Sequence, residues 1–418
     1  MKLVVLTGGT NGDVRPFLAL GKRLKQAGHT VHIATYDMYE STIHEHGLEF
    51  VSYQFDIVQA MQSEAGAALG RCGDSFWCSF SRFVKVMEPG FPTICDSALA
   101  ACQDADGIIC SAFGGHFGPT IARELNIPYI TAFFQPVYPT SSFAHALAPA
   151  FFHRHNLGSI ANSFTQLVGD FIFWYPCKNI FNQWTQERFN KPWSGFFAYR
   201  QQLHPSLCAV SPSVLPKPAG WSDDISIPGY WFLDEAEQWQ APKALTAFLE
   251  AGSPPVVAGF GSMQVTQETV ENIVKALKQT QQRGILLKGW GNLDLSSLPD
   301  NIFVADEIPH DWIYPKASLV INHGGAGSTA AAFRAGTPIL VVPFGFDQPF
   351  WGQRAIDLGV SPNFILHKDL NVENLSLAIN AVVNDKAMQQ RAASLGERIR
   401  AEDGLGHAVE VIKRTLKN

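Results

Sequence analysis

A glycine-rich turn between a buried strand and a helix constrains this chain more than any other feature of its sequence. The turn reads His323-Gly-Gly-Ala-Gly-Ser. The apolar run 318–322 is long enough for one buried strand, and residues 329–335, closed by Gly336 and Pro338, are typical of a helix. Such a turn lets an anion approach bare backbone, and the helix N-terminus adds free N–H groups and the positive end of its dipole. The sequence therefore predicts a phosphate-binding turn, to which His323 can donate a further hydrogen bond.

A carboxylate and an amide follow the next predicted strand. Residues 339–343 form that strand, and Asp347 and Gln348 come just after it. In an open α/β sheet, ligands lie at the carboxyl ends of the strands. Two neighbouring strands would thus bring a phosphate cradle and an Asp-Gln pair to one crevice. Because Asp accepts hydrogen bonds and Gln both donates and accepts, this pair suits adjacent sugar hydroxyls.

Strands and helices alternate along both halves of the chain. This alternation predicts doubly wound parallel sheets, and a length of 418 residues favours two domains. The proline-rich stretch around 212–228 predicts a linker. We therefore expect an α/β protein with the parts 1–212, 213–234 (linker), 235–385 and 386–418, the last of them helical.

The overall composition excludes several classes of partner and location. The net charge is −6 and no basic run occurs, so nucleic acid is not expected as a partner. The seven cysteines include no Cys-x-x-Cys pair, which favours reduced thiols over a disulfide framework. The apolar start of the chain is too short for a signal peptide, and no run of 18 apolar residues predicts a transmembrane segment. We expect a cytoplasmic location, with transient membrane-surface contact and the oligomeric state left open.

Several motifs together resemble the donor-binding signature of nucleotide-sugar glycosyltransferases. The resemblance is strongest to the sterol glucosyltransferases and to the bacterial antibiotic and glycolipid glycosyltransferases. It implies two facing Rossmann-like domains, the GT-B architecture, with the donor site in the second domain and the last helix packed back on the first. The motifs that carry it are Pro309-His310-Asp311-Trp312, His323-Gly-Gly-Ala-Gly-Ser-Thr-Ala-Ala, Arg334-Ala-Gly, Val342-Pro343 and Asp347-Gln348-Pro349.

The resemblance also implies how a UDP-sugar would be bound without a metal ion or other cofactor. The diphosphate would be held by fixed dipoles in place of Mg²⁺. The uracil would meet backbone groups, and the sugar would meet the Asp-Gln pair. The donor-binding residues implied in this way are Ser262, Ile308, His310, His323, Gly325, Gly327, Ser328, Asp347 and Gln348.

The first domain would supply the base and the acceptor site. Gly12-Asp13-Val14-Arg15-Pro16 matches the Gly-Asp-x-x-Pro of the resembled family, which carries an Asp base at the end of the first strand. An alternative role for Asp13 is the N-cap of a helix that starts near Pro16. Thr10, Phe134 and Gln135 are the candidate acceptor-binding residues. The many aromatic residues of 134–200 either pack in the core or line an apolar acceptor cavity.

The expected activity is metal-independent transfer of a hexose, with inversion, from a UDP-sugar to a hydroxyl of a lipophilic acceptor. UDP-glucose is the favoured donor, and dTDP-sugars stay open. The alternatives are a UDP-sugar 2-epimerase and a non-catalytic module that binds a nucleotide sugar. Asp104-Ala-Asp106 resembles a metal-binding Asp-x-Asp, but we interpret it as a solvated turn away from the crevice.

Overall fold

The computed structural model describes residues 1–64, 66, 76–155, 157–261, 263, 265–289 and 298–417. The chain forms two compact units. Unit 1 contains Met1–His145, Asn156–Leu233 and Asp403–Asn418, and unit 2 contains Ala146–His155 and Asp234–Glu402. Residues 146–155 lie in the predicted range of the first domain, but they make their contacts in unit 2.

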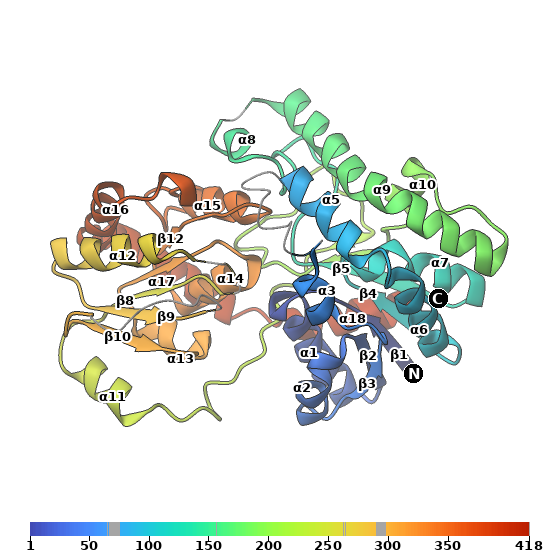
Figure 1. Cartoon of the computed structure of the whole chain (residues 1–418), viewed down its shortest axis with the longest axis horizontal. Helices are drawn as coiled ribbons and strands as arrows, with labels where there is room; N and C mark the ends of the chain where they lie inside the picture. Colours follow the sequence, from blue (N-terminus) through green and yellow to red (C-terminus); the bar gives the residue numbers. More distant parts are fainter. Residues whose placement is uncertain are drawn as a thin grey trace. The chain divides into compact units, whose positions relative to one another are not determined.

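Unit 1 is built on a seven-stranded sheet whose paired strands are all parallel (Figure 1). The strand order is β3-β2-β1-β4-β5-β6-β7. Residues Leu3 to Leu6 of the central strand β1 are fully buried, as expected for a parallel strand covered on both faces. The strands are β1 (Lys2–Leu6), β2 (Thr30–Thr35), β3 (Glu49–Ser52), β4 (Gly107–Cys110), β5 (Tyr129–Phe133), β6 (Ser206–Cys208) and β7 (Ile225–Ser226).

The helices of unit 1 include one very long helix. This is α9 (Ser159–Phe189), with 31 residues. Of the aromatic residues in 134–200, Trp174, Phe181 and Trp184 are buried, whereas Phe164 and Tyr175 are exposed. The other helices are α1 (Asn11–Gln26), η1 (Asp37–Tyr39), α2 (Glu40–Glu45), α3 (Ile57–Gln62), α5 (Phe76–Met87), α6 (Phe91–Cys102), η2 (Gly114–His116), α7 (Gly118–Leu125), α10 (Phe196–Gln201) and α18 (Gly404–Leu416).

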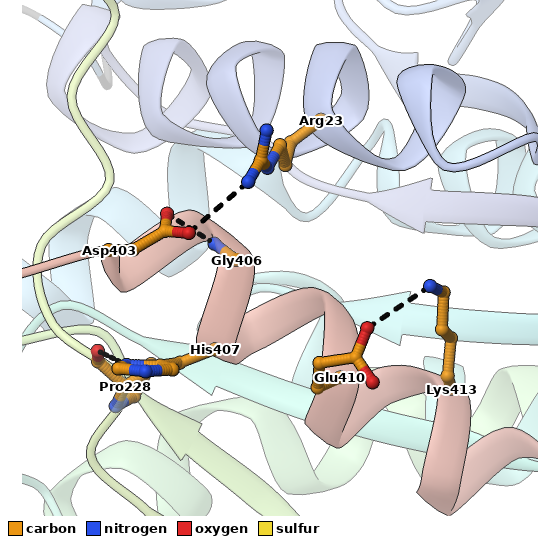
Figure 2. A network of polar contacts seen from close by, with 7 residues as sticks. All are labelled: Arg23, Pro228, Asp403, Gly406, His407, Glu410 and Lys413. Atoms are coloured by element: carbon orange, nitrogen blue, oxygen red, sulfur yellow. Dashed lines mark hydrogen bonds and ion pairs between the residues drawn. The ribbon is translucent and has the colours of Figure 1, made fainter.

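The C-terminal helix α18 belongs to unit 1 and packs beside α1 (Figure 1). Its N-cap residue, Asp403, accepts hydrogen bonds from the Gly406 N–H at 2.9 Å and from the Arg23 guanidinium of α1 at 3.2 Å. His407 donates from Nδ1 to the Pro228 carbonyl at 3.3 Å, as Figure 2 shows. These contacts tie the end of the chain to the first helix and to the segment after β7.

Unit 2 is built on a five-stranded parallel sheet with the order β10-β9-β8-β11-β12. The strands are β8 (Val256–Gly259), β9 (Gly284–Leu287), β10 (Ile302–Ala305), β11 (Leu319–Asn322) and β12 (Ile339–Val341). The helices are α8 (Ala150–Arg154), α11 (Lys243–Glu250), α12 (Gln267–Gln279), α13 (His310–Ile313), η3 (Tyr314–Lys316), α14 (Ala326–Ala335), α15 (Gln348–Asp357), η4 (His367–Asp369), α16 (Val372–Asn384) and α17 (Lys386–Arg400). The doubly wound α/β class that the sequence predicted is confirmed for both units.

The cysteines differ from expectation at one position. Cys78 is disulfide-bonded, so the prediction that all seven thiols are reduced is wrong there. Spacing in the sequence does not reveal the Cα and Cβ geometry on which a disulfide depends. Among the described residues, burial raises the pKa of each free thiol, and these are Cys95, Cys102, Cys110, Cys177 and Cys208.

Membrane-spanning helices and clusters of metal ligands are absent from the described residues. None of their helices is both long and apolar enough to cross a membrane. They also contain no cluster of three or more His, Cys, Asp or Glu side chains that could hold a metal ion. Asp104 and Asp106 instead contact Lys2: its Nζ donates to Asp104 at 2.5 Å and its backbone N–H donates to Asp106 at 2.6 Å.

Candidate active site

Asp13 lies at the carboxyl end of β1, in the first turn of α1. This helix starts at Asn11 and not near Pro16, so Asp13 is its third residue and Thr10 its N-cap. The Asp13 carboxylate accepts through Oδ2 from the Thr10 backbone N–H at 2.8 Å and from the Thr10 hydroxyl at 3.1 Å. The reciprocal capping box starts the helix five residues before Pro16. The interpretation of Asp13 as the N-cap is therefore wrong, because Thr10 occupies the N-cap and Asp13 lies inside the helix.

The turn before α1 is packed tightly around this carboxylate. Gly9 has φ +131°, and a Cβ on it would lie 2.3 Å from Asp13 Oδ2, so only glycine fits there. The Tyr39 hydroxyl donates to the Gly9 carbonyl at 3.1 Å. Burial raises the pKa of the half-buried Asp13 carboxyl, and the two Thr10 hydrogen bonds act in the opposite direction. Burial and the Asp13 charge raise the pKa of Tyr39 to about 12.

The other residues expected near the acceptor have different surroundings. Phe134 and Gln135 follow β5, whose carboxyl end lies at the same sheet edge as that of β1. Phe134 packs edge-on against Phe17 and Trp231, with ring centroids 5.2 and 5.8 Å away. Of this group, the described hydrogen bonds link only Thr10 directly to Asp13.

The glycine turn of unit 2 follows β11, as the sequence predicted. Its shape is set by Asn322, whose side-chain oxygen accepts from the Gly324 N–H at 2.8 Å. Gly324 has φ +87°, and a Cβ on it would lie 2.4 Å from Val341 Cγ1. A Cβ on Gly325 would lie 2.4 Å from His323 Nε2. The glycines therefore bring the backbone close to both β12 and the His323 ring.

The helix after this turn begins without a capping side chain. Its N-cap is Gly325, so the N–H groups of the first turn, at Ala326, Gly327 and Ser328, have no side-chain acceptor from the cap. Ser328 does not cap either, because its hydroxyl donates to the Gly325 carbonyl at 3.2 Å. The N-terminus of α14 can thus receive an anion from outside the protein.

His323 stands at the mouth of this open turn. Its Nδ1 is buried and has no hydrogen-bond partner among the residues that the structure describes. Burial, and to a smaller extent the nearby His310, lowers the pKa of His323 to about 4. A Cβ built on Gly261, in the turn after the neighbouring strand β8, would lie 3.3 Å from His323 Cε1. The ring is therefore neutral at pH 7 and can donate one N–H.

The candidate nucleobase residues follow β10. The Ile308 side chain is buried, and the contact of its backbone with a nucleobase stays a prediction. His310 is exposed and stacks on Tyr314 with a centroid distance of 4.5 Å. Ser262, the candidate on the turn after β8, lies outside the described residues.

Asp347 is the N-cap of α15 and Gln348 is its first residue, and both are more engaged with the protein than the sequence indicated. Asp347 Oδ2 accepts from Trp351 Nε1 at 2.8 Å. Gln348 Oε1 accepts from the backbone N–H groups of Phe344 at 2.6 Å and Gly345 at 3.2 Å. These bonds fix the orientation of both side chains at the strand end.

Comparisons with known proteins agree with this arrangement. Residues 3–144 match the N-terminal domain of glycosyltransferase family 28, and residues 285–415 match the C-terminal domain of the erythromycin biosynthesis protein CIII-like proteins. A sterol 3-beta-glucosyltransferase of Arabidopsis thaliana is 33% identical over the whole chain, which covers 68% of that protein. The chain therefore belongs to the same glycosyltransferase family as that protein. It spans only 30% of a relative from Neosartorya fischeri, a sterol 3-beta-glucosyltransferase that is 34% identical.

Solved structures share the fold of this glycosyltransferase at low sequence identity. The glycosyltransferase of kitacinnamycin aligns with a TM-score of 0.74 at 19% identity, over 99% of both chains. VinC, a glycosyltransferase solved in complex with dTDP, aligns with a TM-score of 0.69 at 17% identity, over 100% of both chains. The GT-B type of fold expected from the sequence is confirmed.

Sequence reasoning missed two residues that shape the candidate sites of this glycosyltransferase. Asn322 forms the glycine turn through its side chain, and Asn directly before a glycine turn is a recognisable signal because Asn often bonds the backbone two residues on. Tyr39 holds Gly9 from 30 residues away. No local pattern would have indicated that contact.

Proposed function

We propose that this glycosyltransferase moves glucose from UDP-glucose to the hydroxyl of a sterol or similar lipophilic alcohol, with inversion and without a metal ion. The observation that carries the proposal is the open N-terminus of α14 beside the unpartnered Nδ1 of His323. Backbone N–H groups, a helix dipole and a neutral imidazole donor together suit a diphosphate. The acceptor class is supported by the two relatives, from Arabidopsis thaliana and Neosartorya fischeri, which are both sterol 3-beta-glucosyltransferases.

Asp13 is the proposed general base. The described hydrogen bonds of its carboxylate both go to Oδ2, which leaves Oδ1 for the acceptor hydroxyl. The raised pKa favours proton acceptance, because a base works best with a pKa nearer the operating pH. The hydroxyl proton passes to Asp13 as the acceptor oxygen bonds the anomeric carbon, and the bond from that carbon to the phosphate oxygen breaks. This attack from the face opposite the leaving group inverts the anomeric centre.

The leaving diphosphate is the part of the reaction assigned to unit 2. Charge that develops on it would be taken up by the N–H groups of Gly327 and Ser328 and by His323. Asp347 and Gln348 would bind sugar hydroxyls, with their geometry fixed by Trp351 and by the Phe344-Gly345 turn. A dTDP-sugar is the second candidate donor, because a structural neighbour was solved with dTDP.

A donor-by-acceptor screen tests the proposal. The full-length protein is incubated in EDTA with UDP-glucose, UDP-galactose or dTDP-glucose and with sterol or phenol acceptors, and products are read by mass spectrometry. We expect a sterol heavier by one hexose, with UDP-glucose as the best donor. Product formation only after Mg²⁺ or Mn²⁺ is added would contradict the metal-free mechanism. Isomerised donor without a glycosylated acceptor would favour the epimerase.

A further inference from the structure

A short segment between β5 and α9 leaves unit 1 and joins unit 2. Both flanking elements belong to unit 1, whereas Ala146–His155 belongs to unit 2. We call residues 146–155 the strap. Its helix α8 packs against α15, the helix that starts at Gln348 (Figure 1). The strap therefore contacts the element that carries the candidate sugar-binding pair.

Arg154 makes the most specific contact of the strap. Its Nη2 donates to the Phe364 carbonyl at 3.1 Å, and its guanidinium carbon lies 4.3 Å from the centroid of the Phe364 ring. Phe364 is buried and forms a parallel bridge with Val341 at the end of β12. A Cβ on Gly352 of α15 would lie 3.0 Å from Phe364 Cβ. Arg154 thus holds a residue that is wedged between β12 and α15.

His153 provides a second contact and closes the strap on itself. Its Nε2 donates to the Ala148 carbonyl at 3.0 Å, and its ring packs edge-on against Phe350 of α15 at 5.7 Å between centroids. Burial lowers the pKa of His153 to about 4, so the ring is neutral at pH 7. The strap is anchored further by Ala146 and Ala148, which are buried.

These contacts reach the helix that begins at the candidate sugar-binding pair. Phe364 contacts β12 and α15, and Phe350 is part of α15. Asp347 is the N-cap of α15, and Gln348 is its first residue. A small shift of α15 would move both side chains relative to the sugar, since α15 begins at Gln348. The phosphate cradle belongs to β11 and α14 and would be affected less.

We propose that the strap is a positioning element for donor-sugar recognition and that Arg154 is its main positioning residue. This inference rests on the proposed function, because it takes Asp347 and Gln348 as the sugar-binding pair. The strap is continuous in sequence with the segment after β5 that contains the candidate acceptor residues Phe134 and Gln135. Through the strap, residues that are distant in sequence from the rest of unit 2 fix which sugar the donor site accepts.

The test compares Arg154→Ala with a matched control, Arg283→Ala. Arg283 also belongs to unit 2, lies 4.2 Å from the centroid of the Phe248 ring and donates to the Ser253 carbonyl at 2.8 Å. It precedes β9, at the sheet edge opposite to the candidate site. For each full-length variant, calorimetry measures the dissociation constants of UDP and of UDP-glucose, and a thermal melt measures stability.

Arg154→Ala should weaken UDP-glucose binding by about 5- to 30-fold, the combined effect of losing a cation–π contact and a charged hydrogen bond. UDP binding should stay within about twofold, and the preference for UDP-glucose over UDP-galactose should shrink. Arg283→Ala should lower the melting temperature and leave the ratio of the two dissociation constants unchanged. Equal ratios in Arg154→Ala, Arg283→Ala and the parent would overturn the proposal.

Two further results complete the test. If Arg154→Ala does not fold, Arg154→Lys is read in the same way, because Lys keeps the charge and loses the planar fork. In one outcome, the parent protein binds UDP-glucose without transferring a hexose, while Arg154→Ala loses the preference for UDP-glucose over UDP-galactose. That combination would contradict the proposed function and support the role of the strap. If the parent protein transfers glucose and the ratio of the UDP and UDP-glucose dissociation constants is the same in all variants, the proposed function is supported and the role of the strap is contradicted.

Discussion

The turns after β1 and after β11 have the same plan and opposite chemistry. Each links a buried parallel strand to a helix, and the third helical residue is Asp13 in α1 and Ser328 in α14. In unit 1 the Asp13 carboxylate occupies the helix N-terminus and accepts from the Thr10 N–H. In unit 2 the cap is Gly325, and the Ser328 hydroxyl turns away to the Gly325 carbonyl. One turn carries its own anion, and the other is left open to an anion from outside.

This difference assigns separate tasks to similar elements. An anion that is already present repels a phosphate but can accept a proton from a neutral acceptor hydroxyl. An open helix N-terminus has no proton-accepting group and stabilises negative charge that develops on a leaving group. The comparison therefore predicts that the closed turn acts in proton transfer and the open turn in donor binding. The first three predictions below each change one side of it, and the fourth changes neither.

The largest effect is expected for Asp13→Asn. The amide oxygen of Asn can still accept from the Thr10 N–H, so the helix start should survive, while the proton-accepting charge is lost. We expect transfer to fall by about 10²- to 10⁴-fold, with melting temperature and UDP affinity close to those of the parent. A variant that melts much earlier would show that the carboxylate is mainly structural. Near-parental turnover in a stable variant would refute its role as base.

His323→Ala changes the open side. It removes a neutral donor whose ring packs against both glycine turns. Loss of one such donor to a developing negative charge typically slows catalysis by about 10²- to 10³-fold. Calorimetry with UDP and steady-state kinetics with UDP-glucose measure the effect. Parental binding and turnover would mean that the backbone N–H groups act without this histidine.

Asp347→Ala separates the sugar from the nucleotide. Trp351 holds the Asp347 carboxylate in the orientation proposed to bind the sugar. Removal of this carboxylate should weaken UDP-glucose binding by about tenfold or more and leave UDP binding nearly unchanged. Trp351→Phe keeps an aromatic ring and removes the Nε1 hydrogen bond to the carboxylate, and it should give a smaller loss of the same kind. Equal losses for UDP and UDP-glucose in Asp347→Ala would identify Asp347 as a residue that only stabilises the fold.

The smallest effect concerns a histidine that does not face either turn. His116 is buried between the Phe181 and Tyr199 rings, and burial lowers its pKa to about 4. Between about pH 6.5 and 4 the unfolded chain binds more protons at this residue, so stability falls as the pH falls. The largest loss from His116 is about 3 kcal/mol at pH 4. In melts at pH 7 and pH 4.5, His116→Phe should lose less stability than the parent on acidification, and equal losses would contradict the assignment.

The sequence predicted the features that depend on local pattern. Alternating apolar runs and helix signals were enough for both parallel sheets and for the β11–turn–α14 unit, since these depend on residues close in sequence. The start of α1 was misplaced because the reciprocal bonds of Thr10 and Asp13 outweigh the preference of Pro16 for a first helical position. No helix was delimited within 134–200 because the residues of α9 are apolar on several faces and show little helical period.

Long-range contacts explain the rest of what the sequence did not predict. No pattern in residues 146–155 indicates that they join the donor-binding unit, because the evidence is the contact of Arg154 with Phe364, 210 residues later. Gln348 was assigned to the sugar alone, yet its side-chain oxygen also accepts from the Phe344-Gly345 turn. Such intramolecular bonds become visible only with coordinates, and they determine how precisely a side chain is held.

One measurement tests the comparison of the two turns most directly. Ser328 occupies the helix position that Asp13 occupies in unit 1, so Ser328→Asp gives the open turn an anion of its own, and Ser328→Asn is the neutral control. Calorimetry with UDP should show Asp13→Asn and Ser328→Asn close to the parent. Ser328→Asp should bind at least about 100-fold more weakly, because a carboxylate would lie a few ångströms from the diphosphate. UDP affinity in Ser328→Asp equal to that in Ser328→Asn would contradict the assignment of this turn as the phosphate site.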